Sequence, residues 1–389
     1  MQKIERHPIL EIPKNKEVIF EFNGTKIAAE SGQTIAAALH QAGFPIHSHQ
    51  EDGRERSMQC GIGKCGACEM LVDGKVKRIC ITKVDGVQRV QEILHHFMPT
   101  NADTSSSEPK VYKTEVAIIG AGPAGLACRE ALNNLGIPNL VIDNNDKIGG
   151  QFNMQTHQFF FFEQEKLYGG MRGFDIATKL AGDDHTGILL NATVWDIFSN
   201  RRIAVKNLKE DSIFYVDSQY IVIATGALPF MPPFENDDLP GVYTAAVVQK
   251  MMNIEHTLLG KRILSIGAGN IGYLTSYQAT QAGAKVVAII EGMDHEGGFP
   301  VQANRIRRLG IPILTSHILL KAIPNENHTG IVGAVIAECK NFQPISGTEK
   351  IIHDIDIINV CTGLLPDNQL LKKSRVIYGL NAYGVGDAV

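Results

Sequence analysis

The chain has 389 residues, of which 44% are hydrophobic and 20% charged, and its formal net charge is −4. This length suits two or three domains, and the charge gives no reason to expect a nucleic acid or an anionic membrane as a partner. No apolar run is long enough to span a bilayer, and the polar first residues lack the apolar segment of a signal peptide. We therefore expect a cytoplasmic protein with reduced cysteines.

The first predicted elements are a hairpin and a helix. Residues 17–27 alternate apolar and polar side chains around Asn23-Gly24, a pair that commonly closes a tight turn between antiparallel strands. Residues 34–42 have the spacing of a short amphipathic helix, and Gly43 marks its end.

Four cysteines follow in the pattern C-x4-C-x2-C-x11-C, namely Cys60, Cys65, Cys68 and Cys80. The first three match the spacing of plant-type 2Fe–2S ligands, and the glycines between them allow backbone amides to turn toward the sulfurs. Structural zinc is also often held by four cysteines, although zinc ribbons pair two C-x2-C knuckles and this segment has one. The pattern favours a 2Fe–2S cluster, with zinc as the alternative.

Short strands are expected over 69–72, directly after Cys68, and over 78–81, which contains Cys80. His47 and His49, which flank a serine ahead of the cysteines, are expected to be solvated. A hairpin, a helix, a cysteine loop and further strands are the order of a β-grasp ferredoxin. We therefore expect residues 1–98 to form an N-terminal ferredoxin-like domain.

The composition changes beyond this domain. Residues 99–110 are rich in serine, proline and small polar residues, which predicts a linker over 99–113. From there the pattern becomes strand, glycine turn and helix, and it occurs a second time much later. This alternation predicts an α/β fold with parallel sheets.

The first strand–turn–helix segment carries a dinucleotide-binding pattern. An apolar strand over 115–120 leads into the sequence GAGPAG, and a second strand over 139–142 ends at Asp143. The motif comprises Gly120, Ala121, Gly122, Pro123, Ala124 and Gly125. In such a motif the pyrophosphate sits at the helix N-terminus, and the acid accepts a hydrogen bond from a ribose hydroxyl. The surrounding strand and helix make this a strong prediction of a dinucleotide site.

A second copy follows the strand over 262–266. Its sequence GAGNIG supplies the glycines Gly267, Gly269 and Gly272. The strand over 285–290 then ends at Glu291, and an acid at this position favours unphosphorylated NAD because it would repel a 2′-phosphate. The alternative is a domain that kept the glycines but binds no nucleotide.

Two dinucleotide motifs in this order resemble the glutathione-reductase-like flavoproteins. Residues 221–226 and 359–363 match the strand-plus-Thr-Gly segments where the chain crosses between the two nucleotide domains. The resemblance implies an FAD domain over 114–255 and 346–389, with an NAD(P)-type Rossmann domain over 256–345 inserted in it. It also implies that further residues lie near FAD, namely Gly150, Gln151, Gly226, Gly386 and Asp387.

Two departures from that superfamily stand out. Neither nucleotide domain contains a C-x2-C or C-x4-C dithiol, so disulfide reductase chemistry is not supported. The sequence also ends at Val389, directly after the Gly-Asp motif, where these proteins usually continue into a helix that faces the flavin. We expect either a fragment or a helix supplied from elsewhere.

The cysteine segment is fused to a flavoprotein-like region that carries the sequence Gly149-Gly150-Gln151. This combination resembles a narrower family. These are the alpha-type subunits of multisubunit amine dehydrogenases and oxidases, the group of sarcosine oxidase, opine oxidase, dye-linked L-proline dehydrogenase and hydrogen cyanide synthase. The resemblance implies a hetero-oligomer in which a partner flavoprotein subunit oxidises a small amine or amino acid. It implies FAD, a 2Fe–2S cluster and NAD or another adenine nucleotide such as ATP in this chain.

The expected function is that of an FAD- and 2Fe–2S-dependent oxidoreductase, acting as the electron-transferring subunit of such a complex. One alternative is a stand-alone NADH-dependent reductase that passes electrons through FAD to its own cluster. The other is a non-catalytic electron-transfer or scaffold subunit. The sequence assigns no catalytic residue.

Overall fold

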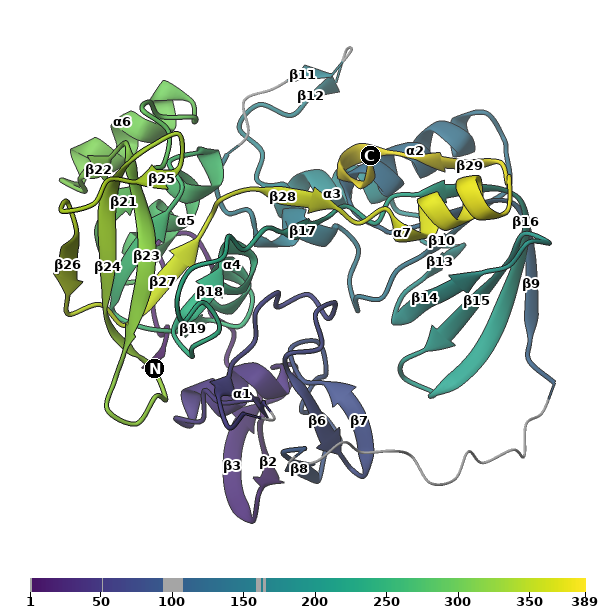
Figure 1. The fold of residues 1–389 in the computed structure, drawn as a ribbon. Coiled ribbons are helices and arrows are strands. Elements are labelled where there is room, and N and C mark those ends of the chain that lie inside the picture. Colours follow the sequence, from purple (N-terminus) through teal and green to yellow (C-terminus); the bar gives the residue numbers. More distant parts are fainter. Residues whose placement is uncertain (1, 51, 94–107, 159–161, 164–165) are drawn as a thin grey trace. The chain divides into compact units, whose positions relative to one another are not determined.

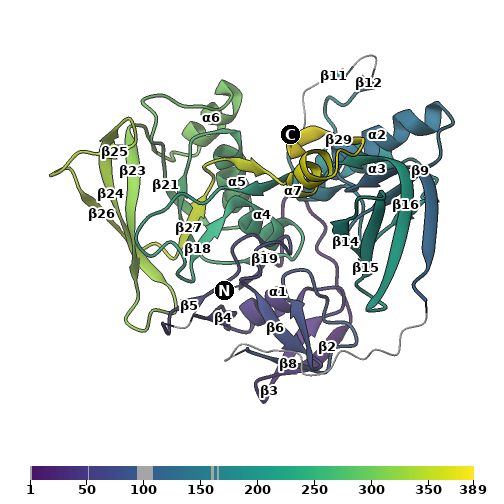
Figure 2. The ribbon, with the colours of Figure 1, turned by 45° about the vertical axis from the view of Figure 1, so that its right-hand side comes forward.

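The computed structural model describes residues 2–50, 52–93, 108–158, 162–163 and 166–389. The chain divides into two compact units (Figures 1 and 2). The first unit joins the N-terminal residues, up to 98, to residues 229–363, and the second joins residues 99–228 to 364–389.

The N-terminal part of the first unit is a mixed sheet in the order β3-β2-β8-β6-β7. The strands β2 (Glu17–Phe22) and β3 (Thr25–Glu30) form the predicted hairpin, and Asn23 and Gly24 both have positive φ in its turn. The other strands of this part are β1 (Gln2–Lys3), β4 (Ser48–His49), β5 (Glu55–Arg56), β6 (Glu69–Val72), β7 (Lys75–Arg78) and β8 (Arg89–Gln91).

The predicted helix is α1 (Ile35–Gln41), whose N-cap Thr34 accepts a hydrogen bond from the amide of Ala37. Its residues Ile35 to His40 are all buried. A helix buried on every side must contact more than one neighbour. Helix α1 accordingly packs both against its own sheet and against the rest of the unit.

The strand predicted over 78–81 is wrong. The structure has β7 at Lys75–Arg78, paired with β6 through a turn at Asp73 and Gly74, a pair that favours hairpin turns. Beyond it the amides of Ile81 and Thr82 both donate to the carbonyl of Arg78. This turn takes Cys80 out of the strand ladder.

The remainder of the first unit is built on a parallel sheet in the order β18-β27-β20-β21-β22. A second sheet is formed by β23, β24, β25 and β26. The strands of this part are β18 (Val242–Thr244), β19 (Thr257–Leu258), β20 (Arg262–Ile266), β21 (Lys285–Ile290), β22 (Ile313–Leu314), β23 (His317–Pro324), β24 (Ile331–Lys340), β25 (Gln343–Pro344), β26 (Lys350–His353) and β27 (Ile357–Val360). Its helices are α4 (Ala245–Asn253), α5 (Asn270–Gln281) and α6 (Pro300–Arg308).

One hydrophobic core runs through both parts of the first unit. Leu39 of α1 and Met70 of β6 belong to the same buried cluster as Tyr243, Met251 and Ile289. The edges are joined as well, because β1 pairs with β19 in antiparallel fashion. The ferredoxin-like part is thus integrated with residues 229–363 of the same unit, which carry the second nucleotide loop and are called the nucleotide part below.

The second unit is built on a sheet in the order β13-β10-β9-β16-β15-β14, with β29 paired to β16. Its strands are β9 (Val111–Ile119), β10 (Asn139–Ile142), β11 (Phe162–Glu163), β12 (Lys166–Leu167), β13 (Ile188–Leu189), β14 (Ala192–Ile197), β15 (Arg202–Asn207), β16 (Ser212–Ile223), β17 (Ala227–Pro229), β28 (Leu364–Pro366) and β29 (Ala382–Gly384). Its helices and helical turns are α2 (Pro123–Asn134), η1 (Gly150–Met154), α3 (Gly173–Ala181), α7 (Gln369–Lys372), η2 (Lys373–Ile377) and η3 (Gly386–Ala388).

The parallel pairing of β9 with β10 and with residues 215–223 of β16 confirms the predicted α/β fold. Most of the predicted linker, residues 99–107, lies outside the described residues, and Val111–Lys113 belong to β9. Within the described ranges, no helix combines the length and apolarity needed to cross a membrane.

Candidate redox and nucleotide sites

The four motif cysteines lie on one loop and on the turn after β7. Cys60, Cys65 and Cys68 stand between β5 and β6, and only Cys65 of the four is exposed to solvent. The interleaved glycines Gly61, Gly63 and Gly66 all have positive φ, as their spacing predicted. This tight path brings backbone amides to the sulfur of Cys60, because the amides of Lys64 and Cys65 both donate to its Sγ at 3.4 Å.

The sulfurs meet in two pairs. The Cys65 thiol donates a hydrogen bond to Cys60, and with help from the loop amides it lowers the pKa of Cys60 to about 5. The same bond raises the pKa of Cys65, and burial raises it further. The hydrogen bond and the loop amides thus favour the thiolate form of Cys60, which is the form that binds metals.

The second pair repeats the arrangement. Cys68 donates to Cys80, which lowers the pKa of Cys80 and raises that of Cys68. The charge of Lys250 and the amide of Gly63 also lower the pKa of Cys80. Over the described part of the chain, no three His, Cys, Asp or Glu side chains gather closely enough to hold a single ion. Two pairs of sulfurs are thus the donor set that the fold presents.

The first nucleotide loop lies between β9 and α2. Gly120 has φ of 113°, and a Cβ there would clash with the carbonyl of Ala224, so a side chain is excluded. A Cβ on Gly125 would collide with the carbonyl of Gly120, where the helix packs on its strand. Gly122 is the N-cap and Pro123 the first residue of α2, which leaves the helix N-terminus open to an anion.

Other predicted residues gather around this helix end. Asp143 accepts from the amide of Ala121 at 2.6 Å, and Gly149 donates to the carbonyl of Ala121 at 2.8 Å. A Cβ on Gly150 would lie 3.0 Å from the Cα of Gly122.

The C-terminal Gly-Asp motif reaches the same helix end. A Cβ on Gly386 would lie 2.6 Å from that of Ala124, which places Asp387 beside the first turn of α2. Gln151 is exposed at the start of η1. Gly226, with φ of 71°, follows β16 at the carboxyl edge of the sheet, where its carbonyl accepts from Asp367. The structure therefore brings the residues predicted to contact FAD to one edge of the second unit.

The second nucleotide loop belongs to the first unit and repeats the geometry. Gly267 has φ of 104°, Gly269 is the N-cap of α5, and a Cβ on Gly272 would collide with the carbonyl of Gly267. Glu291 accepts from the amide of Ala268 at 2.7 Å, as Asp143 does in the first loop.

A glycine pair in the second loop was not predicted from the sequence. Gly297 donates to the carbonyl of Ala268 at 3.1 Å, and a Cβ on Gly298 would lie 3.0 Å from the amide nitrogen of Asn270. Gly149 makes the same bond in the first loop, and in both loops the bonding glycine stands six residues after the acid. This repeated spacing was a signal that the sequence contained.

The expected solvation of His47 is wrong. His47 and His40 are completely buried, and their rings meet edge to face with centroids 4.9 Å apart. The Nε2 of His40 lies 3.4 Å from the hydroxyl of Ser57, which accepts from Tyr243 of β18. The ring centroid of His40 in turn lies 6.1 Å from that of Tyr243, so the histidine pair is buried by a tertiary contact that has no local sequence signal.

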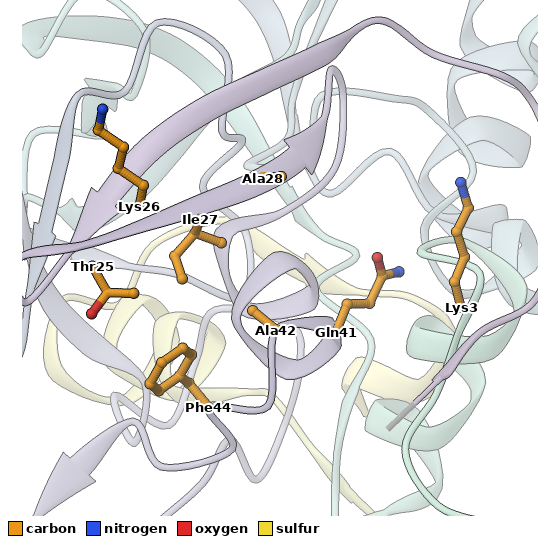
Figure 3. Close-up of a pocket in the computed structure, with 8 residues that line it drawn as sticks. All are labelled: Lys3, Thr25, Lys26, Ile27, Ala28, Gln41, Ala42 and Phe44. Carbon is orange, nitrogen blue, oxygen red and sulfur yellow. The ribbon is translucent and has the colours of Figure 1, made fainter.

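An open groove of about 610 Å³ lies on the ferredoxin-like part, and none of the four motif cysteines lines it (Figure 3). It is lined by Lys3, Thr25, Lys26, Ile27, Ala28, Gln41, Ala42 and Phe44. Two of its walls come from β3 and the end of α1, so it contains no residue of either nucleotide loop.

Comparisons with known proteins agree with this geometry. Residues 15–92 match the 2Fe–2S iron–sulfur cluster binding domain, and residues 114–387 match the pyridine nucleotide-disulphide oxidoreductases. The sarcosine oxidase subunit alpha of Corynebacterium sp. (strain P-1) is 24% identical over 93% of this chain and 39% of its own length. The NADH oxidase of Methanocaldococcus jannaschii is 27% identical over 57% of this chain and 53% of its own length.

A solved structure of L-proline dehydrogenase from P. horikoshii shares the fold across nearly the whole chain. It covers 99% of this chain with a TM-score of 0.68 at 18% identity, and 71% of that protein is covered. The chain spans about half or less of the length of the two curated relatives. The predicted ferredoxin-like and glutathione-reductase-like fold is confirmed, as are its assignments to an FAD-binding domain and a 2Fe–2S domain.

The match to residues 114–387 covers more than half of the chain and includes both nucleotide loops described above. The chain therefore belongs to the pyridine nucleotide-disulphide oxidoreductase family, with a 2Fe–2S cluster binding domain at residues 15–92.

Proposed function

We propose that this chain is the electron-transferring subunit of a complex that oxidises a small amine or amino acid. The observation that carries the proposal is the pairing of the four cysteines in a ferredoxin-like fold, within the same chain as two nucleotide loops. A flavin accepts two electrons and a 2Fe–2S cluster accepts one. Their presence together suits a protein that converts a two-electron oxidation into single-electron deliveries.

We assign Cys60 and Cys65 to one iron of the cluster and Cys68 and Cys80 to the other. Two close pairs of sulfurs support this assignment over a single tetrahedral zinc, which would need all four around one ion. The loop amides that donate to Cys60 would stabilise the negative charge of a bound cluster.

We assign FAD to the loop Gly120–Gly125, with Asp143, Gly150, Gln151, Gly226, Gly386 and Asp387 around it. An adenine nucleotide would occupy the loop of Gly267, Gly269 and Gly272, with Glu291 at the ribose. The open N-termini of α2 and α5 support both assignments.

The substrate class and the partner subunit are supported by the names of the relatives, sarcosine oxidase subunit alpha and L-proline dehydrogenase. A second flavoprotein subunit would oxidise the amine and pass electrons to this chain. We also propose a cytoplasmic location, because free cysteines suit a reducing compartment.

A second candidate is a stand-alone NADH-dependent reductase. The acid Glu291 and the resemblance to an NADH oxidase favour it. Stopped-flow mixing of the anaerobic chain with NADH separates the two functions. The proposed function predicts no rapid bleaching of the flavin by NADH, and reduction by L-proline or sarcosine only when a co-purified partner is present.

Rapid bleaching of the isolated chain by NADH, followed by reduction of the cluster, would instead establish the second candidate. A chain that captures a second flavoprotein but whose cofactors stay oxidised with every amine tested would be a scaffold. Either result would contradict the proposed function.

A further inference from the structure

One face of α4 is directed at the cysteine loop. Thr244, Val247 and Lys250 follow one another at intervals of three residues, which places them on the same side of the helix. The helix belongs to the nucleotide part of the first unit, whereas the loop belongs to the ferredoxin-like part. The two parts therefore meet at the cysteines.

Each of these three residues contacts the loop. The hydroxyl of Thr244 donates to the carbonyl of Gln59 at 2.7 Å. A Cβ on Gly61 would lie 3.2 Å from the Cα of Val247, so the loop backbone lies directly on the helix. The ammonium group of Lys250 donates to the carbonyl of Gly61 at 2.8 Å and to that of Cys80 at 2.7 Å.

The two carbonyls that Lys250 joins belong to separate cysteine segments. Gly61 directly follows the first cysteine, and Cys80 is the last of the four. One ammonium group thus connects the loop to the turn after β7. Because Nζ bonds the backbone of Cys80 itself, its charge lies next to the sulfur pairs.

A second cation that contacts the loop, Arg78 of β7, is paired with a carboxylate, whereas Lys250 is not. Arg78 donates to the carbonyl of Gly63 at 2.7 Å, but its Nε lies 3.1 Å from a carboxylate oxygen of Glu69. Among the ion pairs formed by the described residues, none involves Lys250. Lys250 is also half-buried, so solvent screens its charge less than it screens an exposed lysine.

We propose that the charge of Lys250, held beside the cysteine site by its two hydrogen bonds to the backbone, raises the reduction potential of the 2Fe–2S cluster. The inference rests on the proposed function, which places the cluster at the four cysteines. Gaining an electron adds negative charge there, and a fixed cation at short range stabilises it. The nucleotide part of the unit thereby sets how readily the ferredoxin-like part accepts an electron.

The test compares midpoint potentials, measured by redox titration with EPR detection on the purified chain. Lys250→Met removes the charge and keeps the length of the side chain. We expect this variant to retain its iron. At the midpoint potential of the wild type, its ratio of reduced to oxidised cluster should be about tenfold lower, which corresponds to a midpoint potential lower by about 59 mV for one electron. Lys250→Arg, which keeps the charge, should restore most of the wild-type potential.

Lys26→Met is the matched control, since it makes the same change of charge on β3, at the rim of the groove in Figure 3. Its midpoint should equal that of the wild type. An unchanged midpoint in Lys250→Met with full iron content would overturn the inference. Loss of iron from both Lys250→Met and Lys250→Gln would overturn it too, because Lys250 would then only hold the loop together. A wild type without a cluster would refute the proposed function itself.

Discussion

At the scale of single residues, each nucleotide loop has one glycine whose surroundings are open. Gly122 and Gly269 are the N-caps of α2 and α5, their φ values are −76° and −87°, and a Cβ on either would meet no atom within 4 Å. The described residues therefore leave room for a side chain at these positions. Close approach of a pyrophosphate would require glycine.

Gly122→Ala is therefore expected to fold normally and to lose FAD. The added methyl group fits the protein but stands where the phosphates of FAD would approach, so FAD affinity should fall about tenfold or more. Flavin content after dialysis and the melting temperature of the apoprotein measure the two effects. Gly269→Ala is the matched control and should keep FAD while weakening binding of NADH. Full flavin content in Gly122→Ala would show that FAD does not use this loop.

The buried histidine pair makes stability depend on pH. Burial lowers the pKa of His47 from 6.5 to about 3, and burial together with His47 lowers the pKa of His40. Between about pH 6.5 and 3 the unfolded chain binds protons that the folded chain does not, so the free energy of unfolding falls as the pH falls. The expected slope is about 1.4 kcal/mol per pH unit for each histidine.

His47→Phe tests this prediction because it keeps an edge-to-face ring on His40 without a titrating group. Urea denaturation at a series of pH values should show a smaller slope below pH 6.5 than in the wild type. His353→Gln, at an exposed position of β26, should keep the full slope. Equal slopes in His47→Phe and the wild type would contradict the assignment.

At the scale of elements, α1 begins on a carboxylate from the nucleotide part of its unit. The amide of Thr34 donates to Glu255 at 2.9 Å, and the other carboxylate oxygen lies 3.7 Å from the ammonium group of Lys83. Glu255 is only 5% exposed. Removing a buried acceptor leaves its donors without a partner.

Glu255→Ala is thus expected to lower the free energy of unfolding by about 2 kcal/mol, as measured by urea denaturation. Glu255→Gln keeps an acceptor for Thr34 and should cost less than half as much. Glu5→Ala, at an exposed position, controls for the loss of a glutamate. If Glu255→Ala lowered the free energy of unfolding no more than Glu5→Ala, the contact between Thr34 and Glu255 would add nothing to the stability of the first unit.

The elements that sequence predicted well are those with local signals. Asn23-Gly24 determines the β2–β3 hairpin, and the two glycine loops lie between strand and helix as expected. The shift of β7 has a local cause too, since the Asp73-Gly74 turn was overlooked. Lys250 could not be found this way, because the helix that carries it stands 170 residues beyond Cys80 and its contact with the loop is purely tertiary.

At the scale of the whole molecule, the described residues of the ferredoxin-like part do not form a core separate from the rest of their unit. Its apolar side chains and those of the nucleotide part make up one cluster in the first unit. Elements that share a core lose it together when either part opens. Amides of α1 and α5 are therefore expected to have the same opening free energy in native-state hydrogen exchange.

Denaturant should lower both opening free energies with the same slope. The matched comparison is β15, which belongs to a separate hydrophobic cluster in the second unit. The opening free energy of its amides can therefore differ from that of α1 and α5. If the α1 amides exchanged through an opening of their own while those of α5 stayed protected, the ferredoxin-like part would be an independent domain.

The central claim is that Cys60, Cys65, Cys68 and Cys80 hold a 2Fe–2S cluster in a chain that also holds FAD. Low-temperature EPR of the anaerobically purified, dithionite-reduced protein tests it most directly, together with iron, sulfide and zinc content. We expect a spin-one-half signal from about two iron and two sulfide per chain, and we expect Cys60→Ser to abolish it. A silent spectrum from a protein that contains one zinc and no iron would contradict it.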